Sequence, residues 1–376
     1  MDFDFSAQDQ KRFDAIRSIA RAAPAEDQLA GGTPEETSKA LRKVLKDLAA
    51  AGYLGLGLEG HREADAVTLM GAMETLAVQT RSLFLAVEMS TRVVGRALAR
   101  WAAEPRQKQW LADLRRGEWL GALALSETTM NVENDPLATL ATRKGDRICL
   151  NGQKQYVINA PLADRIGIVG MLEERPALFF VDRSADGLII SERRRTMGYD
   201  GLHLSDLVCR ECDLPKEDVL FPPQGTPVLE RLRRWENEIL LAAALGLMQA
   251  AYTEARDFAQ SHRSGGKPII AYQEVGFKLA EMLTLCQTAQ LLAYRAVWTM
   301  ACEPKEGISL IWCAKVFATE AAERVAGDAL RILAGQGFCS GSAAASAYRA
   351  VKWTQIGGLS TEIARVKIGD HALGYR

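Results

Sequence analysis

The sequence predicts a helical region, a β domain and a second helical region, one after the other along the chain. Three observations support this order. Apolar residues repeat with the 3.6-residue period of helices up to about residue 120. Short β-branched runs separated by turn residues follow to about residue 222, and the helical period returns from residue 229. Because 376 residues exceed one ordinary core, we expect domains at 1–120, 121–226 and 227–376.

Composition and charge restrict the classes of function. The chain is 48% hydrophobic and 25% charged, with a formal net charge of −1, so we expect a globular protein without a nucleic-acid partner. A signal peptide and a run of eighteen apolar residues are both missing, which predicts a cytoplasmic location without a membrane partner. The seven cysteines predict reduced thiols. Cys209 and Cys212 form a CxxC without a second ligand pair, so no metal is expected.

The first helical region contains clear boundary signals. Thr33, Pro34 and Glu36 combine an N-cap, a first-turn proline and a capping-box glutamate, and the apolar stripe that follows ends at Gly52. Further amphipathic segments are expected at 67–78, 83–101 and 105–117.

The middle region has the pattern of strands and turns. Asn151-Gly152 lies between two apolar runs, 148–150 and 156–158, which is typical of a two-residue hairpin turn. Further strands are predicted at 166–169, 177–181, 188–190 and 206–209.

Glu236 stands at the head of an apolar helical stripe that opens the second helical region. The stripe consists of Leu240, Ala244, Leu247, Ala251, Ala255 and Phe258. Since Glu236 precedes Leu240 by four residues, it points toward the packed face. It is either a first-turn residue favoured by the helix dipole or a general base in a pocket. Later helices are expected at 273–298, at 308–333 and after Leu359.

Five tracts in order along the chain resemble the acyl-CoA dehydrogenase family. They are EPRQKQWLADLRRGEWLGALALSE, LNGQKQYVINA, MGYDGLHLSDLVCRECDLPKEDVL, HRSGGKPIIAYQEVGFKLAEM and YRAVKWTQIGGLSTEIARVKIG. The resemblance implies an N-terminal α-helical domain, a middle β-domain and a C-terminal four-helix bundle, with FAD between the last two. It also implies a homodimer or homotetramer. The implied reaction removes an α-proton from an acyl thioester while the β-hydrogen leaves as hydride to flavin N5.

The predicted base departs from the position that most of the family uses. The family usually carries its base in the sequence YEGT, where this chain has Gly357 and Gly358. A branch that includes isovaleryl- and long-chain acyl-CoA dehydrogenases places its glutamate on the helix that opens the last domain. Aligning LGLMQ at 245–249 puts that glutamate on Glu236, while Gly358 leaves the usual catalytic position without a carboxylate. Glu238 is the rival, more than half a turn away.

The resemblance also assigns contacts to the cofactor. Tyr156 replaces a tryptophan against the flavin, and Ile158 replaces a threonine that hydrogen-bonds flavin N5, which an aliphatic side chain cannot do. Arg263, or its neighbour His262, corresponds to an arginine that reaches the FAD of the neighbouring subunit. The other predicted cofactor-binding residues are Ser126, Gln273, Gly335, Ser360 and Glu362. A loop over flavin and substrate is expected at 128–135.

The altered flavin edge and substrate loop favour a substrate outside ordinary fatty-acid β-oxidation. An acyl or aminoacyl group on an acyl carrier protein in secondary metabolite biosynthesis is one interpretation, and an acyl-CoA is the other, because both carry a phosphopantetheine arm. The expected electron acceptor is a flavoprotein or oxygen. A non-catalytic subunit that partners an active homologue, and a flavin-dependent oxidase or monooxygenase, are the alternatives.

Overall fold

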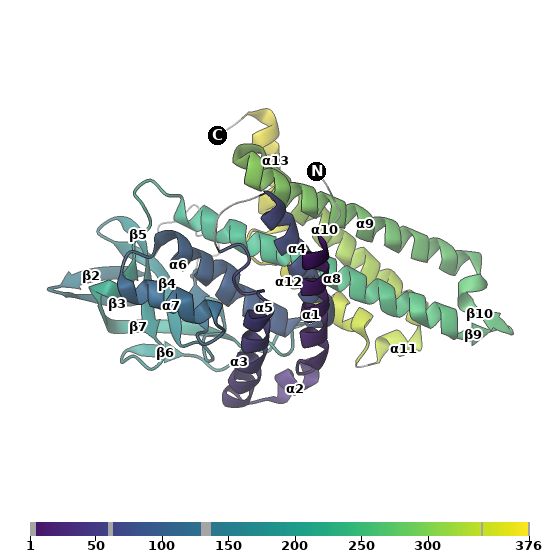
Figure 1. The fold of residues 1–376 in the computed structure, drawn as a ribbon, viewed down its shortest axis with the longest axis horizontal. Coiled ribbons are helices and arrows are strands. Elements are labelled where there is room, and N and C mark those ends of the chain that lie inside the picture. Colours follow the sequence, from purple (N-terminus) through teal and green to yellow (C-terminus); the bar gives the residue numbers. More distant parts are fainter. Residues whose placement is uncertain (1–4, 59–62, 129–136, 340, 375–376) are drawn as a thin grey trace.

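The computed structural model describes residues 5–58, 63–128, 137–339 and 341–374 (Figure 1). The first helical region contains α1 (Ala7–Ala22), α2 (Glu26–Gly31), α3 (Pro34–Ala50), α4 (Glu63–Gln79), α5 (Ser82–Glu88), the π-helix η1 (Met89–Val94), α6 (Gly95–Trp101) and α7 (Pro105–Arg115). The strands of the middle region are β1 (Gly121–Ala124), β2 (Leu140–Lys144), β3 (Arg147–Ile158), β4 (Arg165–Leu172), β5 (Arg175–Asp182), β6 (Leu188–Ile190), β7 (Leu204–Pro215) and β8 (Val219–Leu220). The second helical region contains α8 (Val228–Ser261), α9 (Gln273–Cys302), α10 (Pro304–Leu333), α11 (Gly335–Phe338), α12 (Ala343–Ile356) and α13 (Thr361–Leu373).

The helix start predicted at Thr33 is confirmed. The Thr33 hydroxyl accepts a hydrogen bond from the Glu36 backbone N–H at 3.2 Å, and the Glu36 carboxylate accepts one from the Thr33 N–H at 2.9 Å. This reciprocal pair satisfies two N–H groups at the start of α3. The apolar stripe of α3 then packs Leu41, Leu45 and Leu48 into the core.

The eight strands form one mostly antiparallel sheet in the order β6-β7-β3-β2-β4-β5-β8, and β1 pairs with β4 in parallel. The hairpin predicted at Asn151-Gly152 is wrong. The turn lies earlier, at Gly145 and Asp146, since Lys144 pairs with Arg147. Asn151 and Gly152 instead lie inside β3, where the register with β7 shifts. Gly152 allows the Thr139 side chain to pack closely against the β3 backbone, because a Cβ at this position would lie 2.4 Å from Thr139 Oγ1.

The long helix α8 connects the sheet with the far end of the molecule. Its 34 residues span about 50 Å at 1.5 Å per residue. α8 packs with α9, α10 and α12 as a four-helix bundle, and α4 covers it from the first helical region (Figure 1). A short hairpin, β9 (Arg263–Ser264) and β10 (Lys267–Pro268), ends α8 on the side opposite the sheet (Figure 1).

The described residues form two hydrophobic cores. The larger core joins both helical regions to one face of the sheet, and the smaller core lies within the β region. No helix among the described residues is long and apolar enough to cross a membrane. Those residues also contain no group of three or more histidines, cysteines or carboxylates placed to hold a metal ion. The domain limits 1–120, 121–226 and 227–376 stay a prediction.

Candidate active site

Glu236 faces the turn that joins α12 to α13. It lies in the third turn of α8 and is partly exposed. A Cβ built on Gly358 would lie 3.4 Å from Glu236 Cγ. Gly358 has a φ of +63°, a conformation that side chains disfavour. The predicted base and the position left vacant by Gly358 are therefore neighbours.

The backbone of residues 357–360, which we call the glycine turn, is held from α8. Arg233 Nη1 donates a hydrogen bond to the Gly358 carbonyl at 2.5 Å. The Asn237 side-chain oxygen accepts one from the Leu359 N–H at 2.9 Å. Asn237 is 2% exposed, so the turn has a fixed partner one residue after Glu236.

Lys315 on α10 holds the same turn from the other side. Its ammonium donates to Asn237 Oδ1 at 2.8 Å, to the Gly357 carbonyl at 2.5 Å and to the Leu359 carbonyl. Lys315 is fully buried. Burial lowers its pKa to about 7, and the nearby carboxylate of Glu236 acts in the opposite direction.

Glu238, the rival candidate for the base, is bound to arginines. Its carboxylate lies 2.6 Å from Arg96 Nη1 and 3.9 Å from Arg234 Nε. The guanidinium groups of Arg96 and Arg234 therefore occupy the Glu238 carboxylate and leave it less accessible to a substrate. Among the described residues, Glu236 has no ion pair within 4 Å, so its carboxylate is the one left available.

A cavity of about 220 Å³ lies beside this turn, between α12 and the segment 194–204. Its lining combines aromatic, aliphatic and basic side chains: Tyr156, Tyr199, Leu202, Leu204, Met197, Trp353, Ile356, Arg194, Arg195, Arg349 and Lys352. A Cβ built on Gly357 would lie 3.2 Å from Trp353 Cε2. Trp353 therefore lies between the cavity and the glycine turn.

Tyr156 reaches this cavity because of a bulge in β3. The register with β7 shifts between Lys154 and Val157, and Tyr156 has a φ of +58°. Such a bulge turns a side chain away from the regular alternation of the strand. The Tyr156 N–H donates to Asp206 Oδ1 at 3.1 Å, and the guanidinium of Arg194 lies 4.9 Å from the centre of the Tyr156 ring.

Ser126 lies next to this bulge. Its carbonyl accepts a hydrogen bond from the Gln155 N–H at 2.8 Å. The buried Lys154 holds both neighbours of Ser126, because its ammonium donates to the Leu125 carbonyl at 3.1 Å and to Glu127 at 2.7 Å. Burial is the largest single effect and acts to raise the pKa of Glu127, but the hydrogen bonds from Lys154, Thr139 and the Ala138 N–H together with the charge of Lys154 outweigh it, so the net pKa is lowered.

Two family models match the chain: "Acyl-CoA dehydrogenase, middle domain" over residues 122–212 and "Acyl-CoA dehydrogenase, C-terminal domain" over residues 225–373. The chain belongs to the acyl-CoA dehydrogenase family. The predicted fold of this family is thereby confirmed. The protein is an FAD-dependent oxidoreductase that dehydrogenates acyl thioesters at a CH–CH bond.

Relatives of this acyl-CoA dehydrogenase align over almost the whole chain. The 3-(aryl)acrylate reductase of Clostridium sporogenes is 26% identical, covering 96% of this chain and 99% of the relative. Benzylmalonyl-CoA dehydrogenase of Aromatoleum aromaticum is 27% identical, covering 98% of each. The solved structure of the prolyl acyl carrier protein oxidase AnaB shares the fold with a TM-score of 0.86 and 22% identity, over 98% of this chain and all of AnaB.

The remaining predicted cofactor residues of this dehydrogenase fall into two places. Ile158 is buried at the end of β3, opposite Leu204. Ser360 caps α13 by accepting from the Ile363 N–H at 3.4 Å, and Glu362 follows on the exposed first turn. Residues 129–135 of the predicted substrate loop lie outside the described residues.

The second place is far from the first within one chain. Arg263 in β9, Gln273 at the start of α9 and Gly335 at the start of α11 are exposed and lie at the end of the molecule opposite the sheet (Figure 1). The Arg263 guanidinium donates to the Gly266 carbonyl at 2.6 Å. His262, the alternative to Arg263, stacks on Phe258 at 4.6 Å.

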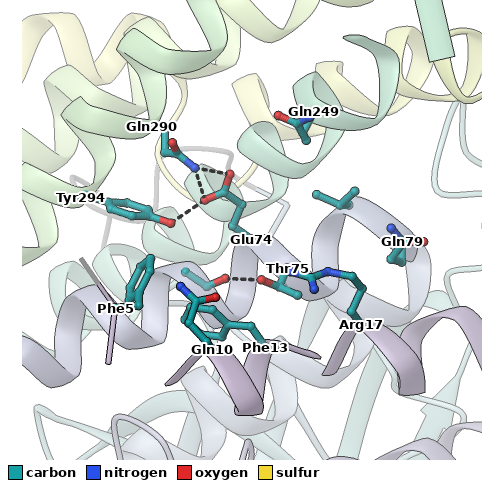
Figure 2. A pocket seen from close by; sticks show the side chains of 12 residues that line it. Phe5, Gln10, Phe13, Arg17, Glu74, Thr75, Gln79, Gln249, Gln290 and Tyr294 are labelled. Atoms are coloured by element: carbon teal, nitrogen blue, oxygen red, sulfur yellow. Dashed lines mark hydrogen bonds between the residues drawn. The ribbon is translucent and has the colours of Figure 1, made fainter. Parts of the chain in front are cut away.

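A further cavity of about 310 Å³ lies between α1, α4, α8 and α9 (Figure 2). Figure 2 shows Glu74 with Gln290 and Tyr294, whose side chains donate to its carboxylate at 2.8 to 3.0 Å. Burial raises the pKa of Glu74. The cavity is separate from the active site, because Gln249 in its lining is thirteen residues, or about 20 Å along α8, from Glu236.

Sequence reasoning missed the residues that support the site. Lys315 has a signal that could have revealed it, since it lies on the buried face of α10 with Ile311 and Ala318, at helical spacing. A charged residue in such a stripe requires polar partners. Those partners, Asn237 and the carbonyls of the glycine turn, come from distant segments and carry no local sequence signal.

Proposed function

We propose that Glu236 is the base that removes the α-proton of the acyl thioester. The observation that supports this most directly is the closeness of the Glu236 side chain to Gly358, the position that carries the base in most of the family: a Cβ added there would lie 3.4 Å from Glu236 Cγ. Because Gly358 has no side chain, a carboxylate from α8 has access to the space that the usual base would fill. The pairing of Glu238 with Arg96 and Arg234 supports the same assignment.

The residues around the 220 Å³ cavity fit the ring system of FAD. The Trp353 indole N–H is buried and has no hydrogen-bond partner among the described residues. A planar heteroaromatic ring with carbonyl acceptors could accept from this donor and stack on the aromatic lining. When bound, FAD accepts the hydride that leaves the β-carbon. Ile158 supplies only an apolar contact at this edge, while Tyr156, Ser126, Ser360 and Glu362 are the proposed polar contacts.

We propose that a second copy of the chain completes the cofactor site. Arg263, Gln273 and Gly335 belong to β9, α9 and α11 at the end of the molecule opposite the sheet that carries Tyr156 (Figure 1), so we expect them to serve one FAD together with Tyr156 only across a subunit interface. The guanidinium of Arg263 is suited to a phosphate group. A homodimer or homotetramer follows from this arrangement.

We propose that the acyl group is carried either by an acyl carrier protein or by CoA. Both kinds of carrier occur in the names of similar proteins, benzylmalonyl-CoA dehydrogenase and the prolyl acyl carrier protein oxidase AnaB. Anaerobic flavin bleaching by a panel of acyl-CoAs and acyl carrier proteins decides between them. Bleaching by long fatty acyl-CoAs alone would contradict the carrier-protein interpretation. The electron acceptor is then identified by comparing the rate of oxygen uptake with the rate at which an added electron-transfer flavoprotein is reduced.

The variant Glu236→Gln tests the base. Glutamine keeps the shape of the side chain but does not accept the proton, so the rate of flavin reduction should fall by about 10²- to 10⁴-fold. FAD content and thermal stability should be nearly unchanged. Flavin reduction at the unaltered rate would contradict the proposal, and the loss seen instead in Glu238→Gln would transfer the role to Glu238.

A further inference from the structure

Lys315 is a buried cation whose three N–H groups are all used within the glycine turn and its support. The acceptors are Asn237 Oδ1 and the carbonyls of Gly357 and Leu359. An ammonium has three donors and a neutral amine has two, so three acceptors around one nitrogen fit the charged form. No carboxylate among the described residues lies within 4 Å of this nitrogen.

The glycine turn has its carbonyls directed at cations. Gly357 and Leu359 accept from Lys315, and Gly358 between them accepts from Arg233. The Leu359 N–H is taken by Asn237 Oδ1, which itself accepts from Lys315. The position of the turn against Glu236 therefore depends on one lysine of α10 together with two residues of α8.

The carboxylate of Glu236 also acts on the charge of Lys315. The charged groups that affect the pKa of Lys315 are Glu236 and Arg233 from α8 and Glu362 from α13. From α12 the lysine meets the Gly357 carbonyl, and no charged side chain of the described parts of α9 or α12 adds to these effects. The Glu236 carboxylate raises the pKa of Lys315 and so favours the ammonium form that the three acceptors require.

We propose that Lys315 is a positioning residue for the base: its ammonium fixes the glycine turn against Glu236. This inference rests on the proposed role of Glu236. It requires the charged form of Lys315, because a neutral amine cannot donate to all three acceptors. A lysine that only fills space would act equally well in either charge state.

The test is the rate of flavin reduction in FAD-loaded Lys315→Met and Lys315→Arg. Loss of the positive charge in Lys315→Met should lower the maximal rate by about tenfold or more, because the turn and the base are less well placed. In the wild type the rate should decline above about pH 7, where Lys315 loses its proton, and Lys315→Arg, which keeps the charge, should lack that decline. Lys144→Met, which removes an exposed lysine of β2, is the control and should behave as the wild type.

A second measurement keeps the inference testable if Lys315→Met does not fold. In protein labelled at lysine Cε and Nζ, an NMR titration follows Lys315 directly, without substrate or turnover. Glu236→Gln should lower the pKa of Lys315, since the neighbouring anion is lost. An unchanged Lys315 titration in Glu236→Gln, or an unchanged rate of flavin reduction in a folded Lys315→Met, would overturn the inference. Failure of the base itself is recognised separately, by flavin reduction that survives in Glu236→Gln.

Discussion

Gly358→Ala tests how tightly the glycine turn and α8 fit together. The added methyl group meets two obstacles. The φ of +63° disfavours any side chain, at a cost of about 1 to 2 kcal/mol. The new Cβ would also lie 2.4 Å from Asn237 Oδ1, a distance too short for two non-bonded heavy atoms, so one of them has to move.

The second obstacle adds to the first because Asn237 is not free to move. Its Oδ1 accepts from Lys315 and from the Leu359 N–H. A shift that breaks one of these hydrogen bonds leaves a buried donor unsatisfied, at about 1 to 3 kcal/mol. The predicted loss of stability for Gly358→Ala is therefore about 2 to 5 kcal/mol.

Gly145→Ala is the matched control for this prediction. Gly145 has the same φ of +63°, but no atom lies within 4 Å of the place that a Cβ would take there, so only the conformational cost of about 1 to 2 kcal/mol applies. Equilibrium denaturation of the two variants beside the wild type measures the difference. Equal losses in Gly358→Ala and Gly145→Ala would refute the tight fit against Asn237. The same contact predicts that Gly358→Glu does not restore activity to Glu236→Gln, because the new carboxylate would start from the same clash.

Three further predictions concern other residues. Glu238→Gln should lower stability by on the order of 3 kcal/mol, since it leaves the charge of Arg96 partly unpaired, while flavin reduction stays near the wild-type rate; a catalytic loss with unchanged stability would contradict this. Burial lowers the pKa of His203 to about 4. Between pH 6.5 and 4 the unfolded chain therefore binds a proton that the folded chain does not. The free energy of unfolding should decrease by about 3 kcal/mol as the pH is lowered through this range. Denaturation of His203→Gln should lack that part of the pH dependence, and parallel curves would disprove it. Arg263→Ala should lose bound FAD through a missing contact of about 1.5 to 3 kcal/mol, whereas Arg256→Ala should retain it; full FAD content in both variants would exclude a role for Arg263.

The order of the elements could be predicted from sequence because hydrophobic periodicity and capping are local. The capping box at Thr33 and the stripe behind Glu236 depend on residues within a few positions of one another. The hairpin prediction at Asn151-Gly152 failed for a tertiary reason. Gly152 lies in β3 because Thr139 approaches its backbone closely, and the local turn preference of Asn-Gly was overridden.

The candidate site likewise contains residues that local sequence patterns predict and residues that only the tertiary structure reveals. Glu236 could be found from its helix face and from the resemblance to a branch of the family. The closeness of Glu236 to Gly358, 122 residues later, needed the folded chain. The roles of Asn237 and Lys315 could not be predicted, because their partners include backbone atoms of the glycine turn. Every residue has such atoms, so the sequence does not indicate which of them accept or donate these hydrogen bonds. The pairing of Glu238 with Arg96 likewise joins two distant helices.

Exchange of the α-hydrogen of the substrate with water tests the role of Glu236 most directly. A thioester substrate carrying deuterium at the α-carbon is incubated anaerobically with FAD-loaded enzyme, and loss of the label to water is followed by mass spectrometry. Wild-type enzyme should release the deuterium, and Glu236→Gln should release it about 10²- to 10⁴-fold more slowly. Release at the wild-type rate from folded, FAD-loaded Glu236→Gln would show that another group removes the α-proton.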